Sequence, residues 1–77
     1  MNYKIQKEKV RQIVNRYDPE NLIDGGAPED EYDAHVDRIL SMLQAGTLSA
    51  SNLQRVFPGA PKQIDYRAFF DDISHAK

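Results

Sequence analysis

The sequence predicts an all-α protein, a compact bundle of about four short helices plus one short helical turn. Apolar residues recur at the helical spacing of three and four in several segments, and no segment alternates long enough to form a strand. Capping residues and Pro or Gly breakers divide the chain between these segments. The 77 residues leave room for one core, so a single helical domain is expected over residues 1–77.

Residues 3–17 are predicted to form the first helix. Its buried face gathers the apolar and aromatic residues that share one side at helical spacing: Tyr3, Val10, Ile13, Val14 and Tyr17. Ile5 points about 135° from this face at 100° per residue, so it is expected either to contact a neighbouring element or to form an exposed apolar spot. The helix should end at Asp18, because a proline disfavours helical geometry in the residue before it.

A short helical turn is expected next. Asp18 has the side chain of an N-cap and Pro19 suits the first helical position. The turn runs through Leu22 and is closed by the pair Gly25-Gly26, which can adopt the left-handed conformation after a helix.

The next helix is predicted to begin near Pro28 to Asp30 and to run to about Ala45. Its buried stripe is spaced as a helix requires: Tyr32, Val36, Ile39, Leu40 and Leu43. Gly46 ends it.

Two further helices are predicted from their caps. Ser49 is the expected N-cap of one and Asp65 of the other. Each has the apolar pair that staples a helix start, Leu48 with Leu53 and Ile64 with Phe69.

Charge is distributed unevenly along the chain. Residues 1–17 carry five bases, whereas residues 18–37 carry eight acids and no Lys or Arg. This is unlike the basic face of a nucleic-acid-binding domain, so no nucleic acid is expected as partner. No apolar run is long enough to span a membrane, and the first residues lack the apolar core of a secretory signal, so a cytoplasmic protein is expected.

No catalytic, metal or cofactor site is predicted. The stretch from Glu29 to Asp37 holds several carboxylates and His35, and the alternative function is a small metal-dependent or hydrolase-like enzyme built on Asp33, Asp37 and His35. Helical geometry argues against it, because His35 lies about 160° from Asp33 at 100° per residue. With no Cys, a thiolate zinc site is excluded.

Residues 17–33, YDPENLIDGGAPEDEYD, resemble the signature of a small uncharacterised bacterial all-helical family. The shared pattern is an aromatic-Asp-Pro, a Leu-Ile turn and then Gly-Ala-Pro-x-Asp-Glu-Tyr-Asp. The resemblance covers roughly residues 8–57, and the tail from Pro58 departs from it. It implies a small helical domain from a bacterium with no assigned activity, and therefore no functional residue.

The signature has two interpretations, as a folding device or as a recognition surface. Its expected structural positions are Asp18, Pro19, Gly25, Gly26, Pro28, Asp30, Tyr32 and Asp33. Among them Asp18, Asp30 and Asp33 are expected to cap helices.

The leading functional prediction is a non-enzymatic protein-binding module, of an immunity or regulatory type, that uses an acidic surface at residues 18–37. Glu29, Glu31 and Asp37 are the predicted contact residues, because they are expected to be exposed. A basic partner protein would suit them. A homodimer also stays open, since a chain this short buries a modest core and gains from pairing.

Overall fold

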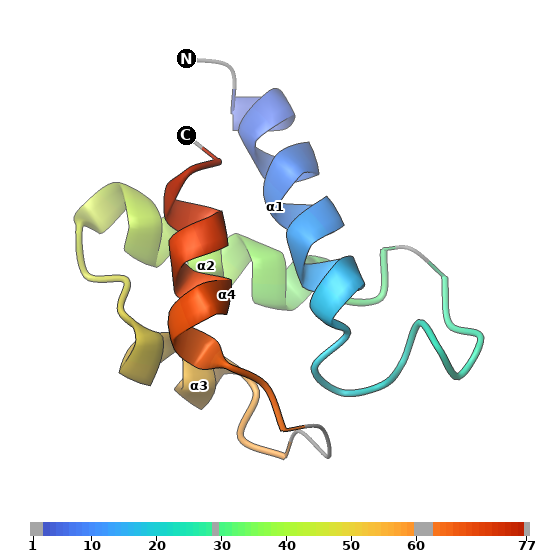
Figure 1. Ribbon diagram of the computed structural model, residues 1–77. Helices are drawn as coiled ribbons and strands as arrows, with labels where there is room; N and C mark the ends of the chain where they lie inside the picture. The colour runs from blue at the N-terminus through green and yellow to red at the C-terminus, as the bar shows by residue number, and fades with distance from the viewer. Residues whose placement is uncertain (1–2, 29, 60–62, 77) are drawn as a thin grey trace.

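The computed structural model describes residues 3–28, 30–59 and 63–76, and these form four helices and no strand (Figure 1). The helices are α1 (Tyr3–Tyr17), α2 (Asp33–Ala45), α3 (Ala50–Val56) and α4 (Tyr66–Ser74). Each helix packs against two others: α1 against α2 and α4, and α3 against the same two. The predicted all-α bundle is thus confirmed.

All four helices contribute to one core. Its buried apolar residues are Val10, Ile13, Val14, Tyr32, Val36, Ile39, Leu40, Leu53, Val56, Phe57, Phe69, Ile73 and Ala76. Phe69 stacks on Tyr17 of α1 with ring centroids 4.4 Å apart. Phe57 lies 6.1 Å from Phe69 and so joins the end of α3 to α4. Aromatic rings therefore tie the C-terminal helix to both halves of the bundle.

The buried face of α1 is rotated from the predicted one at its first turn. Gln6 is buried beside Val10, whereas Tyr3 is 49% exposed, so its predicted place in the core is wrong. Gln6 lies four residues before Val10 and so falls on the same helical face. Ile5 is 56% exposed. Of the two predicted alternatives for this residue, the exposed apolar spot is therefore confirmed.

The predicted caps of α3 and α4 are confirmed. The Ser49 hydroxyl accepts a hydrogen bond from the Asn52 amide at 3.1 Å. The Asp65 carboxylate accepts from the amides of Arg67 and Ala68. At the end of α2, Gly46 adopts the left-handed conformation with φ of 75°, as its position after the apolar stripe predicts.

The start of α2 differs from the prediction. The helix begins at Asp33, preceded by turns in which the Pro28 carbonyl accepts from Glu31 and the Asp30 carbonyl from Asp33. No side chain caps it, so the predicted capping by Asp30 and Asp33 is wrong. Tyr32 occupies the N-cap position and is fully buried.

Candidate functional site

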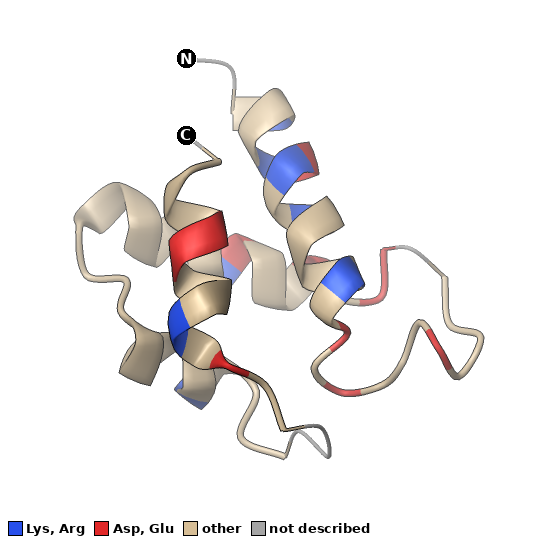
Figure 2. Cartoon of the chain, viewed as in Figure 1, with Lys and Arg blue, Asp and Glu red and all other residues tan. Residues whose placement is uncertain are grey.

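The segment between α1 and α2, residues 19–32, is called the acidic loop below. Figure 2 shows acidic positions spread along this connection and a basic position in the last turn of α1, just before it. It contains no Lys or Arg. It leaves the end of α1 and returns to the start of α2, so both of its ends are fixed by helices that pack together (Figure 1).

Asp18, the residue directly before the acidic loop, anchors it through hydrogen bonds. Its side chain is buried, with 4% of the residue exposed. The carboxylate accepts hydrogen bonds from the amides of Ile23 at 3.0 Å and Asp24 at 2.9 Å, and from the Tyr32 hydroxyl at 2.6 Å. The predicted N-cap role is wrong, because an N-cap binds amides two or three residues ahead, and here the amides lie five and six ahead.

The backbone at Asp18 follows from this arrangement. Its amide still donates to Val14 within the last turn of α1, and its φ of 48° is in the left-handed region. Asp18 therefore ends α1, where a glycine is commoner. The Asp18 carbonyl then accepts from Asn21, which places Pro19 in a tight turn and not in a helix as predicted.

Tyr32 closes the same network from the other end of the loop. Its hydroxyl donates to Asp18 and accepts from the amides of Glu20 at 2.9 Å and Leu22 at 3.3 Å. Burial, and then the hydrogen bond to Asp18, raise the pKa of Tyr32 to about 12. The phenol therefore stays neutral and acts as a structural donor at neutral pH.

Of the two glycines predicted to close the turn in the first half of the loop, Gly26 adopts the left-handed conformation and Gly25 does not. Gly26 has φ of 96° and donates to the Ile23 carbonyl, while Ala27 donates to Leu22. These two bonds are those of a Schellman motif and close one helical turn. Leu22 and Ile23 pack against the core, so the loop is anchored by apolar contacts as well.

The described acidic residues from Asp24 to Asp37 fall into two groups, those whose carboxylates are exposed and those whose carboxylates are bound by a base of α1. Asp24, Asp30 and Glu31 are exposed, and Glu29 lies outside the described residues. Asp30 is close enough to Arg11 to raise its pKa, although less than Asp33 does. No ion pair or side-chain hydrogen bond among the described residues involves Asp24 or Glu31, so these carboxylates face solvent.

Asp33 and Asp37 are bound within the chain. Arg11 donates to both oxygens of Asp33, from Nε at 2.9 Å and from Nη2 at 2.8 Å. Lys7 lies 2.9 Å from the carboxylate of Asp37, which is still 52% exposed. These hydrogen bonds are the largest causes that raise the pKa of Arg11 and of Lys7. Asp37 is thus exposed as predicted, but it already has a cationic neighbour.

His35 does not join these two carboxylates. Its ring stacks on Phe57 with centroids 5.0 Å apart, and its Nε2 lies 3.6 Å from Glu20. The other ring nitrogen, Nδ1, is buried without a hydrogen-bond partner, so it cannot meet a substrate. The triad of the enzyme alternative is therefore not assembled by this geometry.

The described residues offer neither a metal site nor a membrane-spanning helix. Within the described ranges, no three His, Asp or Glu side chains gather as a metal ion would need. Among the same residues no helix has both the length and the apolar character to cross a bilayer.

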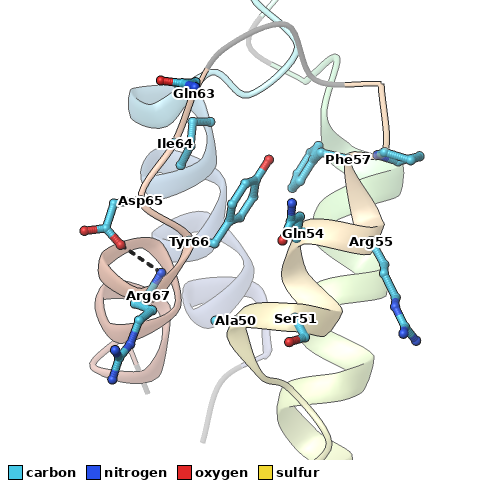
Figure 3. A pocket seen from close by; sticks show the side chains of 11 residues that line it. Ala50, Ser51, Gln54, Arg55, Phe57, Gln63, Ile64, Asp65, Tyr66 and Arg67 are labelled. Carbon is cyan, nitrogen blue, oxygen red and sulfur yellow. Dashed lines mark hydrogen bonds between the residues drawn. The ribbon is translucent and has the colours of Figure 1, made fainter.

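A groove between α3 and the start of α4 was not predicted. Its volume is about 1130 Å³, and Figure 3 shows Tyr66 and Gln54 reaching into the gap below Phe57. Arg55 and Arg67 lie at its two edges, and Figure 3 shows their guanidinium ends directed outward from the gap. Sequence periodicity could not reveal it, because the groove depends on how the segment before α4 lies against α3. We call it the α3–α4 groove.

Comparison with known proteins adds no assignment: no family model, curated protein or solved structure matches this chain. The resemblance of residues 17–33 to a bacterial family stays a prediction.

Proposed function

We propose that this protein is a non-enzymatic binding module that presents its acidic loop to a basic region of a partner protein. The observation that carries the proposal is the contrast between the two groups of carboxylates. Asp33 and Asp37 are used inside the chain, whereas Asp24 and Glu31 face solvent on a loop without a base.

The anchoring of the loop supports this function. Asp18 and Tyr32 hold it from both ends, and a loop already ordered loses less conformational entropy when it binds. The exposed carboxylates then act mainly on the encounter, because complementary charge raises association rates more than final affinity. An immunity or regulatory role, in a bacterial cytoplasm, fits such a surface.

The predicted contact set needs one revision. Glu31 remains in it, and Glu29 remains an expectation outside the described residues. Asp37 is less suited, because Lys7 and the Tyr3 hydroxyl already lie against it. Asp24 takes its place as an exposed carboxylate whose side chain has no role in the fold, although its backbone amide does.

The experiment compares capture of partners by three immobilised proteins from a lysate of the source organism. These are the wild type, the variant Asp24→Asn with Glu31→Gln, and a control that loses two exposed carboxylates elsewhere, Glu8→Gln with Asp71→Asn. We expect the loop variant to lose a basic protein that wild type and control retain. Association of that protein should slow with added salt, since screening acts on exposed charges.

Equal melting temperatures of the three proteins are the condition for the comparison, because they exclude misfolding as the cause of a loss. If the loop variant and the wild type capture the same proteins at low salt, the carboxylates serve solubility and the proposal fails.

A further inference from the structure

We propose that the α3–α4 groove is a docking site for the acidic loop of a second copy of this chain. The inference rests on the proposed function for the role of the loop and adds the identity of one partner surface. The lining of the groove combines apolar side chains with two arginines.

The apolar part of the groove is formed by Ile64 and Tyr66, beside the buried ring of Phe57. Tyr66 and Ile64 are only partly buried, so their surfaces remain available for contact. Burial and the nearby Glu20 raise the pKa of Tyr66, so its phenol is neutral at neutral pH and can donate a hydrogen bond to a carboxylate.

The charged part of the groove favours an acidic occupant. Arg55 and Arg67 line it, and no ion pair among the described residues uses either guanidinium. Asp65 also lines it, but its carboxylate accepts hydrogen bonds from the first amides of α4. The bases of α1 differ: Lys7 and Arg11 already bind carboxylates of α2.

The acidic loop offers the matching chemistry. Asp24 and Glu31 supply charge, and Pro28 between them is an exposed apolar residue. A guanidinium binds a carboxylate through two parallel hydrogen bonds, so the arginines can orient the loop. Because exposed ion pairs add little affinity each, the apolar contacts must hold the pair together, and a weak, salt-sensitive dimer is expected.

The start of the acidic loop lies near the groove in one molecule: His35 stacks on Phe57, which lines the groove, and its Nε2 lies 3.6 Å from Glu20. Glu20 of the acidic loop is close enough to Tyr66 of the groove to raise its pKa. Because one molecule carries both the acidic loop and the two arginines, these surfaces are complementary between two copies. A two-fold axis between two copies would place each loop against the groove of the other, so the assembly closes as a dimer.

The test is sedimentation velocity of the full chain over a range of concentrations, at low and high salt. The groove variant is Arg55→Glu with Arg67→Glu, and the loop variant is Asp24→Lys with Glu31→Lys. A control with the same charge change as the groove variant, Lys9→Glu with Arg16→Glu, alters exposed bases of α1. Circular dichroism of each variant checks that it is folded.

We expect wild type and control to dimerise at low salt, with a dissociation constant that rises about tenfold at high salt. Each of the other two variants alone should stay monomeric. An equimolar mixture of them should restore the dimer, because the acidic loop of one then meets the arginines of the other.

A wild-type chain that is monomeric at every concentration overturns the inference, as does a dimer that the groove variant leaves intact. Neither result bears on capture of a basic protein by the loop, so failure here is distinct from failure of the proposed function. If the mixture of variants does not dimerise, the pairing of loop with groove is wrong.

Discussion

The Tyr32 hydroxyl donates a 2.6 Å hydrogen bond to the carboxylate of Asp18, and this contact joins the two ends of the acidic loop. Because both residues are buried, the bond forms away from water. Buried polar groups are costly when they lose a partner, so the order of the loop depends on this pair.

Removal of the hydroxyl in Tyr32→Phe should lower the free energy of unfolding by about 1–3 kcal/mol, because it leaves the Asp18 carboxylate and two loop amides short of a partner. Urea unfolding measures the loss. The matched control is Tyr66→Phe, since the described residues offer its hydroxyl no hydrogen bond. Equal effects of the two changes would mean that the Asp18 contact is not stabilising.

The same pair predicts a loss of stability at high pH. The pKa of Tyr32 is raised to about 12 from its ordinary value of 10.0, so the folded state favours the neutral phenol. This contribution to the free energy of unfolding is complete below pH 10 and is lost as the pH rises through about 12, by roughly 3 kcal/mol. The difference in unfolding free energy between wild type and Tyr32→Phe should therefore narrow over that range. A constant difference would contradict the raised pKa.

Features that depend on residues close by in the sequence were predicted correctly, whereas a feature that depends on a distant residue was missed. Ser49 and Asp65 cap their helices as predicted, because a cap binds amides two or three residues ahead. Gly26 and Gly46 have the expected left-handed conformation for the same reason. The role of Asp18 was missed, since it depends on Tyr32 fourteen residues away along the chain.

Contacts that form only when two helices pack together could not be predicted from the sequence either. Arg11 is on the polar side of α1 by its spacing, and only the packing of α1 on α2 brings it to Asp33. His35 was predicted only to lie apart from Asp33 on its helix, and its contact with Phe57 arises because α3 packs on α2. The expected exposure of Glu31 and Asp37 is confirmed, whereas Asp30, expected to cap a helix, is exposed as well. Asp33 is bound as expected, but by Arg11 and not as a cap.

The ion pair of Arg11 with Asp33 should stabilise the contact of α1 with α2. Its two hydrogen bonds and partial burial predict a coupling energy of about 1 kcal/mol in a double-mutant cycle of Arg11→Gln and Asp33→Asn. The more exposed pair of Lys7 and Asp37, in the cycle Lys7→Gln and Asp37→Asn, should show a smaller coupling. A larger coupling energy for Lys7 and Asp37 than for Arg11 and Asp33 would show that packing, and not the paired hydrogen bonds, sets the coupling energy.

Phe69→Ala should leave the chain largely unfolded at room temperature. Phe69 is completely buried and stacks on Tyr17, and truncation of a buried aromatic costs about 3–5 kcal/mol. That approaches the whole stability of a small domain. Circular dichroism reports the loss of helix, and Phe70→Ala, at a half-buried position, should be milder. An unchanged melting curve for Phe69→Ala would mean that α4 is peripheral.

The central claim is that the exposed carboxylates of the acidic loop form the binding surface. Its most direct test is an NMR titration of the isotope-labelled protein with a short lysine-rich peptide as basic probe. We predict that the largest amide shifts fall on Asp24, Asp30 and Glu31, and that Asp24→Asn with Glu31→Gln abolishes them. Larger shifts at Asp71 and Asp65 of the C-terminal half, with the loop amides unmoved, would contradict the account.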